Sequence, residues 1–116
     1  MVVRITSFVL TIAGALALIS GLFFWAGVAL NLVSMHMLLG FLSVAALWIV
    51  GIGQAFSTGG SWTIAACAIA IGALTAYVGL YHSTWMIGPL HWVIQAIHLL
   101  LGILTIGLGH IAAARR

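Results

Sequence analysis

Two histidines begin matching seven-residue segments of this sequence. His36 opens the segment HMLLGFL and His98 opens HLLLGIL, and five of the seven positions are identical. Four residues after each histidine comes a glycine, Gly40 or Gly102, which on a helix lies on the same face one turn further on. Two imidazoles from facing helices can occupy both axial positions of a haem iron, and a glycine leaves room for the flat macrocycle. The pattern therefore predicts haem b between His36 and His98, with these two histidines as the iron ligands.

Further polar side chains are expected around this pair. His91 lies seven residues before His98, on the same helix face and about 10 Å along the axis. His82 is expected at the same end of the protein, so either residue is a candidate to hydrogen-bond a haem carboxylate or a quinone oxygen, or to bind a second metal together with the other. The alternative for both is an interfacial histidine exposed to water. Gln95 is a further candidate cofactor contact, with a hydrogen bond between helices as the alternative. His110 points away from His98 and is interpreted as an interfacial residue.

A purely structural explanation exists for the same histidines. In a membrane, an imidazole can hydrogen-bond a backbone carbonyl, and a glycine can let two helices approach closely. Two histidines at duplicated positions nevertheless favour ligation over packing. Four other glycines are spaced by seven in each half of the chain and are interpreted as close helix packing: Gly14, Gly21, Gly72 and Gly79.

The composition places these residues in a membrane. The chain has 116 residues, of which 66% are hydrophobic and 3% charged, and it contains no Asp or Glu. Its three cationic side chains, Arg4, Arg115 and Arg116, stand at the two ends, so no basic surface for nucleic acid is expected. The lack of carboxylates excludes paired-carboxylate hydrolysis and a Ser-His-Asp triad, and it disfavours a proton-coupled transporter. Cys67 has no partner for a disulfide within the chain.

Four apolar stretches are long enough to cross a bilayer, which takes about 20 helical residues. Short polar or Gly- and Pro-containing breaks separate them, so consecutive helices must run antiparallel. The prediction is an all-α integral membrane protein, a single domain of residues 1–116 folded as an up-down four-helix bundle. Its spans are expected at about residues 5–27, 30–54, 62–82 and 89–112, and Gln54, at the end of the second span, is interpreted as a loop residue.

The arginines predict the orientation of this bundle. Arg4 and the pair Arg115 and Arg116 fall on the same side, and the positive-inside rule makes that side cytoplasmic. Both termini are thus expected in the cytoplasm, in the plasma (inner) membrane, with the haem in the outer half of the bilayer. The length of the first span favours a true membrane helix over a cleaved secretory signal.

Internal similarity indicates two duplicated helical hairpins. His36 and His98 are separated by 62 positions, whereas the first and third spans align with an offset of 58. That second alignment matches residues 14–16 with 72–74 and residues 21–22 with 79–80. A duplication of this kind predicts a pseudo-twofold axis along the membrane normal, with the two histidines at equal depth on either side of it.

The segment from Gln95 to Thr105 resembles the haem-binding helices of the haem A synthase family. That resemblance covers the second and fourth spans and implies a four-helix bundle holding haem between histidines of these helices. Some members of the family are single half-size bundles, and four-helix b-type membrane cytochromes are similar in outline. Members of the synthase family carry a glutamate on a ligand-bearing helix, and this chain has none. In the family this glutamate is associated with oxidation of the haem methyl group. The resemblance therefore implies the scaffold and the haem, while the missing glutamate favours electron transfer or cofactor carriage.

The sequence thus predicts a small b-type cytochrome that takes electrons from a quinol or a membrane redox subunit. Its size suggests a subunit of a respiratory or photosynthetic complex, or a homo-oligomer. Three alternatives remain open at this point. They are a half-size haem-modifying enzyme, a structural or assembly subunit, and a metal or chlorophyll-type pigment site at His36, His82, His91 and His98.

Overall fold

The computed structural model describes residues 1–115, and within this range the fold is entirely helical. Four long helices follow one another along the chain, and a short 3₁₀ turn precedes the second and follows the third. The helices are α1 (Val2–Trp25), α2 (Val33–Ala55), α3 (Trp62–Tyr81) and α4 (His91–Ala113), and the turns are η1 (Leu30–Leu32) and η2 (His82–Thr84).

Each helix is long and apolar enough to cross a membrane. At 1.5 Å per residue, 20 to 24 residues measure roughly 30–36 Å, which matches the hydrocarbon core of about 30 Å. Large apolar side chains such as Phe8, Leu38 and Leu100 are more than half exposed on the outside of the bundle. Such a surface is stable against lipid and not against water. The chain is therefore an integral membrane four-helix bundle, as predicted.

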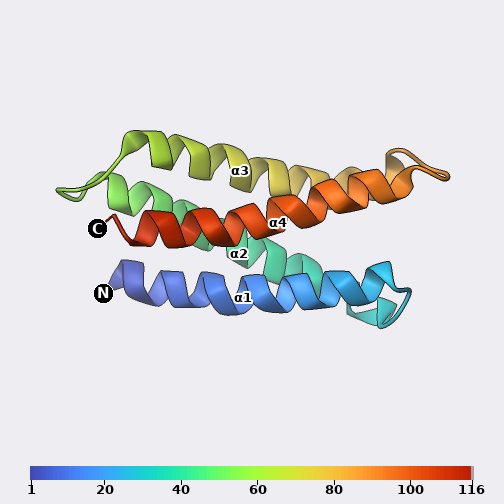
Figure 1. Cartoon of the computed structure of the whole chain (residues 1–116). Helices are drawn as coiled ribbons and strands as arrows, with labels where there is room; N and C mark the ends of the chain where they lie inside the picture. The colour runs from blue at the N-terminus through green and yellow to red at the C-terminus, as the bar shows by residue number, and fades with distance from the viewer. Residues whose placement is uncertain (116) are drawn as a thin grey trace.

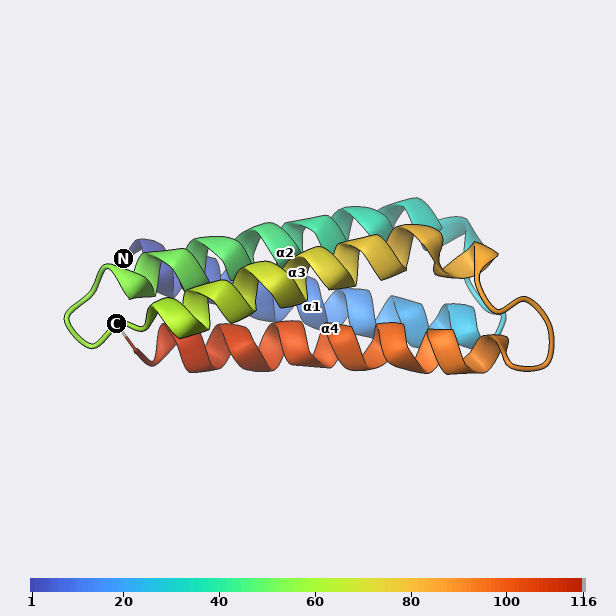
Figure 2. The same cartoon turned by 90° about the horizontal axis from the view of Figure 1, so that it is seen from above.

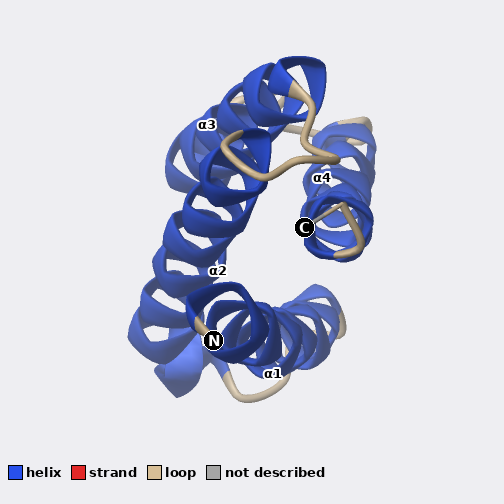
Figure 3. Ribbon diagram, turned by 90° about the vertical axis from the view of Figure 1, so that its left-hand side faces the viewer, coloured by secondary structure: helices blue, strands red, loops and turns tan. Residues whose placement is uncertain are grey.

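The helices run alternately up and down (Figure 1). Both described ends of the chain lie beside the α2–α3 connection, and the two other connections lie at the opposite end of the molecule (Figures 1 and 2). We call these the terminal end and the loop end. Each helix packs against the next one in sequence, α4 also contacts α1 and α2, and the view along the bundle shows this arrangement (Figure 3). Arg116, part of the predicted cytoplasmic cluster, lies outside the described residues.

The helix ends differ from the expected spans by a few residues, for backbone reasons. α1 ends at Trp25 rather than residue 27, because Gly27 has a φ of 79°, outside the right-handed helical region. α4 begins at His91 rather than residue 89, since Gly88, with a φ of 115°, and Pro89 form a turn before it. These two turns close the loop end of the bundle.

The tightest packing lies toward the terminal end. Leu10, Leu47 and Ala68 are almost completely buried there, in one apolar cluster. Small residues bring the helices together, since a Cβ added at Gly51 would lie 2.5 Å from the Cβ of Ala68 and one added at Gly109 would overlap Leu10. The centre of this half of the bundle is therefore filled by side chains, and a groove of about 210 Å³ lies to one side, between α1 and α2.

Gln54, expected from the sequence to lie in a loop, is instead a fully buried residue in the last turn of α2. Its side-chain Nε2 donates to the carbonyls of Gly51 and Ser61 at 2.8 and 2.7 Å, and its Oε1 accepts from the N–H of Ser61 at 2.9 Å. Burial is possible because the α2–α3 loop satisfies both ends of the amide. The expectation was wrong because the partners of Gln54 are backbone groups, and the folded α2–α3 loop brings those of Ser61 close to its side chain.

The antiparallel arrangement is testable by labelling. With Cys67 replaced, single cysteines at Thr58 and Ser83, both exposed, are expected to react with a membrane-impermeant thiol reagent from opposite faces. Thr58 lies in the α2–α3 connection and Ser83 in the α3–α4 connection, on either side of one membrane crossing. Labelling of intact cells and inverted vesicles measures this, and reaction of both sites from the same face would contradict the topology.

Candidate functional site

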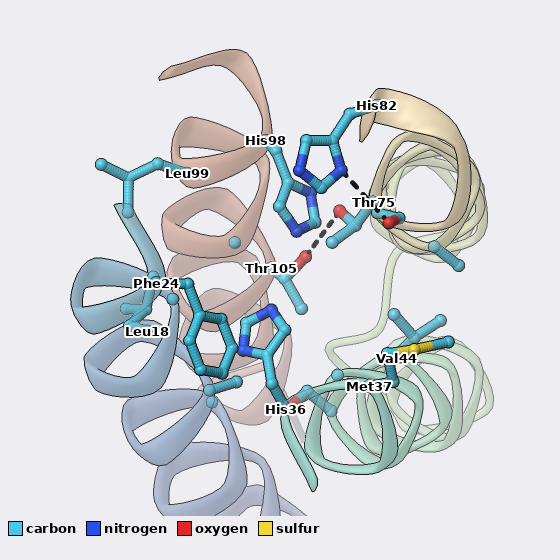
Figure 4. Close-up of a pocket in the computed structure, with 18 of the residues that line it drawn as sticks. Leu18, Phe24, His36, Met37, Val44, Thr75, His82, His98, Leu99 and Thr105 are labelled. Carbon is cyan, nitrogen blue, oxygen red and sulfur yellow. Dashed lines mark hydrogen bonds between the residues drawn. The ribbon is translucent and has the colours of Figure 1, made fainter. Parts of the chain in front are cut away.

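A cavity of about 420 Å³ opens toward the loop end of the bundle, and all four helices contribute to its wall. This volume is within the range of roughly 300–1,000 Å³ found for small-molecule pockets. Its lining is mainly apolar, with a few polar side chains that include His36 and His98 (Figure 4). The described structure thus combines a packed terminal half with a hollow loop half.

His36 on α2 and His98 on α4 face each other within this cavity. Their ring centroids are 6.3 Å apart, and the ring planes are nearly perpendicular at 76°. Both side chains are partly buried and both belong to the cavity wall. The two histidines singled out by the duplicated sequence segments are therefore brought together by the fold.

A glycine lies against each of these imidazole rings. A Cβ added at Gly21 on α1 would lie 3.2 Å from Cε1 of His36, and one added at Gly79 on α3 would lie 2.9 Å from Cε1 of His98. Helix packing alone, the role expected from the sequence, is therefore an incomplete description of Gly21 and Gly79, because each also makes space for a histidine ring. The alignment offset of 58 already paired Gly21 with Gly79, so symmetry was the signal for this role.

The other glycines behave differently. Gly14 contacts Ile106 and Gly72 contacts Trp48, as expected for close helix packing. Gly40 and Gly102, predicted to leave room for a macrocycle, both line the cavity. A Cβ at Gly40 would meet nothing within 4 Å, whereas one at Gly102 would lie 3.3 Å from Leu18. The open space is thus larger beside α2 than beside α4.

The hydroxyl of Ser20 fixes the tautomer of His36. Ser20 Oγ donates its single proton to the carbonyl of Ala17 at 3.0 Å and lies 2.9 Å from Nδ1 of His36. Both contacts are hydrogen bonds only if the Nδ1–H of His36 donates to Ser20. In neutral His36, Nε2 then carries a free lone pair, which is the form that binds metals.

His98 lacks such a partner. Its Nδ1 is buried without a hydrogen bond, and within residues 1–115 it is the one histidine that forms no hydrogen bond at all. The offset of 58 explains the difference, because the position equivalent to Ser20 is Val78, which has no hydroxyl. A buried imidazole without a partner is costly, so this residue calls for an explanation.

An aromatic ring also packs against each histidine. Phe24 lies 5.2 Å from His36 between ring centroids, and His82 lies 5.1 Å from His98 with its plane only 17° away. Phe24 and His82 are again separated by 58 positions. His82 therefore occupies in the second hairpin the place that a phenyl ring occupies in the first, and it lines the cavity (Figure 4).

The remaining candidates occupy the edge of the site or lie outside it. His91 stacks on His82 at 6.1 Å and its Nδ1–H donates to the carbonyl of Trp85 at 2.9 Å, but it is not part of the cavity wall. Gln95 is in that wall. His110 lies toward the terminal end, where its Nε2 is 3.2 Å from the hydroxyl of Thr11. His110 is thus separate from the cavity histidines, as its position on the helix predicted.

A hydroxyl layer lies between the cavity and the packed terminal half. Thr75 on α3 and Thr105 on α4 are both buried, with their Oγ1 atoms 3.1 Å apart. Their hydroxyls also donate to the carbonyls of Ile71 and Leu101, at 2.7 and 2.9 Å. Because these groups are satisfied within the protein, the layer closes the cavity without requiring water.

The part of the chain that the structure describes forms no site in which several protein side chains surround a metal ion. Residues 1–115 contain no group of three or more His, Cys, Asp or Glu side chains arranged to hold a metal ion. The four histidines near the loop end form a row rather than a ligand shell. A metal held by these protein side chains alone, one of the alternatives from the sequence, is therefore not supported.

The chain matches no protein-family model, no curated protein and no solved structure. The interpretation of the site accordingly depends on its geometry.

Replacing Gly79 by Ala tests the close contact with His98. The new methyl group would have to displace the imidazole ring, which is expected to destabilise the protein by about 1–3 kcal/mol. Gly107→Ala is the matched control on α4, because a Cβ there meets nothing within 4 Å and alanine favours a helix by roughly 0.5–1 kcal/mol. Thermal unfolding in detergent, followed by circular dichroism, measures both; equal melting temperatures would contradict the contact.

Proposed function

We propose that the protein is a small membrane b-type cytochrome that holds one haem b between His36 and His98 and transfers electrons. The observation that carries the proposal is the pair of facing imidazoles in a cavity walled by all four helices. His82 also lines the cavity, but it lies in the turn η2 and stacks on His98 with its plane 17° away, so these two rings do not oppose each other across the cavity.

The spacing of the rings fits two ligands on one metal atom. Metal–imidazole bonds are about 2.0–2.1 Å for zinc and similar for iron, and the ring centre lies roughly 1.1 Å beyond the nitrogen, so two opposed rings should have centroids about 6.3 Å apart. The rings of His36 and His98 are 6.3 Å apart. Coordination through Nε2 would give the imidazole of His98 one partner, while its Nδ1 stays without a hydrogen bond.

The surroundings fit a haem as well. The cavity is apolar over most of its wall, with Gly40 and Gly102 facing it without side chains. Ser20 holds His36 as the tautomer with Nε2 free, the kind of outer hydrogen bond that orients metal-ligating histidines. When bound there, haem supplies one-electron redox chemistry. The protein's part is to hold both ligands and to exclude water.

Two ligating histidines favour electron transfer over oxygen chemistry, because they leave no open position on the iron. The half-size haem-modifying enzyme is the second candidate from the sequence, and no observation in the cavity favours it. The wall contains no carboxyl group, since the chain has no Asp or Glu.

The position of the cavity near the loop end indicates which half of the membrane would hold the haem. If the terminal end carrying Arg4 and Arg115 is cytoplasmic, the haem lies in the outer half of the plasma (inner) membrane. The protein would then pass electrons between a donor in the membrane and an acceptor on the outer side. A chain this small is proposed to work within a larger redox complex or as a homo-oligomer.

Substitution of the two histidines tests the function. We expect the purified protein to show sharp α and β bands in a dithionite-reduced minus oxidised spectrum, with one haem b per chain. In His36→Ala and His98→Ala these bands should be lost or become high-spin, because one axial ligand is missing. His110→Ala is the matched control and should keep them. A colourless wild type from a haem-sufficient host would instead support a structural role.

Removing the hydroxyl beside His36, or adding one beside His98, tests how a hydrogen bond to Nδ1 of each histidine affects haem binding. Ser20→Ala removes the acceptor from His36 and is expected to weaken haem binding about 10-fold, as loss of such outer partners does. Val78→Ser supplies His98 with the equivalent hydroxyl and is expected to strengthen binding or lower the midpoint potential. Haem transfer to apomyoglobin measures retention, and potentiometry measures the potential. An unchanged Ser20→Ala protein would contradict the role of this hydrogen bond.

A further inference from the structure

The two hairpins differ in polarity at the loop end of the cavity. Applying the offsets of 58 and 62 to cavity-lining residues gives four pairs in which an apolar residue of the first hairpin is replaced by a polar residue of the second. One pair, Ala17 and Thr75, belongs to the hydroxyl layer at the closed end of the cavity. The three pairs at the loop end are Phe24 and His82, Trp25 and Ser83, and Val33 and Gln95. We call His82, Ser83 and Gln95 the polar mouth.

Packing alone does not require His82. In the first hairpin, Phe24 packs edge-on against His36 at 5.2 Å without any polar group, so an apolar ring can cover a cavity histidine. Nδ1 of His82 is partnered by backbone carbonyls, whereas its Nε2 has no hydrogen bond to a described residue. A ring in the cavity wall with one free nitrogen offers a contact for a ligand on that side.

The hydrogen bonds of His82 define what that ligand must offer. Its Nδ1 lies 3.1 and 3.2 Å from the carbonyls of Val78 and Gly79, and a carbonyl only accepts, so Nδ1 carries the proton. In neutral His82, Nε2 is then a pure acceptor, with no hydrogen bond to a described residue. Ser83 and Gln95 can each donate or accept, so His82 is the residue that discriminates.

We propose that the polar mouth binds the reduced, hydroxyl-bearing form of a lipid-soluble hydroquinone. Its O–H donates to Nε2 of His82, and the side-chain amide of Gln95 can donate to a lone pair of the same oxygen. The ring packs on apolar wall residues at the loop end, such as Trp25 and Val33, which leaves the space between His36 and His98 to the haem. The oxidised quinone has only carbonyl oxygens and would place an acceptor against an acceptor. A hydroquinone bound there would lie beside the haem of the cytochrome proposed above, so this assignment rests on that function.

A haem carboxylate is the competing occupant of the polar mouth. A haem carboxylate also offers only acceptor oxygens to His82. Arg4, in the first turn of α1, and Arg115, whose carbonyl accepts from Ser57 of the α2–α3 connection, both lie at the terminal end of the bundle, away from the polar mouth. A carboxylate at the polar mouth would therefore meet neither a cation nor a donor from the neutral His82. The chemistry of the site favours a neutral O–H group.

Three matched probes test the proposal on the purified full-length protein under anaerobic conditions. They are tetramethylhydroquinone, its quinone, and its dimethyl ether, which share a ring and differ in hydrogen-bond donors. In equilibrium dialysis, the wild type should bind the hydroquinone at least about 10-fold more tightly than either other probe. Equal affinity for all three probes would overturn the proposal without need of a variant.

His82→Phe copies the first hairpin and should retain the stacking on His98. We expect it to lose roughly 3- to 10-fold in hydroquinone affinity and to bind the dimethyl ether unchanged. His110→Phe, the same change outside the cavity, should bind all three probes like the wild type. An equal loss in both variants would overturn the role of His82.

Haem content, measured on the same samples, separates the two proposals. A protein without haem that still selects the hydroquinone would refute the cytochrome and retain the polar mouth. Binding of protohaem and of protohaem dimethyl ester is compared in the wild type and in His82→Phe. If the wild type prefers protohaem and the variant does not, the polar mouth binds the haem carboxylates, and the hydroquinone proposal is overturned.

Discussion

This bundle partly buries several histidines within a membrane and has no carboxylate side chain to pair with them. That constraint decides which hydrogen bonds and tautomers the histidines adopt. Each imidazole N–H that finds a partner finds a neutral one, the hydroxyl of Ser20 for His36 and backbone carbonyls for His82 and His91. Neutral acceptors fix the tautomer without adding charge. They leave Nε2 lone pairs at the loop end, and these lone pairs define which ligands the cavity can take.

Because the hairpin is repeated, the bundle contains two such histidines, which face each other. A glycine beneath the ring and an aromatic ring beside it occur around both His36 and His98, with the same offset along the chain. Where the repeat holds, the cavity suits a ligand that is the same on both sides, such as an iron with two axial positions. Where it fails, at Val78 and His82, the second hairpin has lost a hydroxyl and gained an acceptor.

Much of this arrangement could be predicted because a lipid bilayer requires spans that are apolar, helical and about 20 residues long. The four helices, their antiparallel order and the pairing of His36 with His98 follow from apolar length, short loops and the duplicated segments. The support of the rings could not be predicted, because Ser20 and Gly21 have roles only once α1 lies against α2. The buried Gln54 was mispredicted for a similar reason, since its partners are backbone groups brought close by the folded loop.

The most direct measurement of the central claim is pulsed electron paramagnetic resonance of the ferric protein with ¹⁵N-labelled histidine. It counts the histidine nitrogens bound to the iron. Two on a low-spin iron in the wild type, and one in each of His36→Ala and His98→Ala, are predicted if these rings are the ligands. A wild-type spectrum with a single histidine nitrogen, or with two that survive either substitution, would contradict the account.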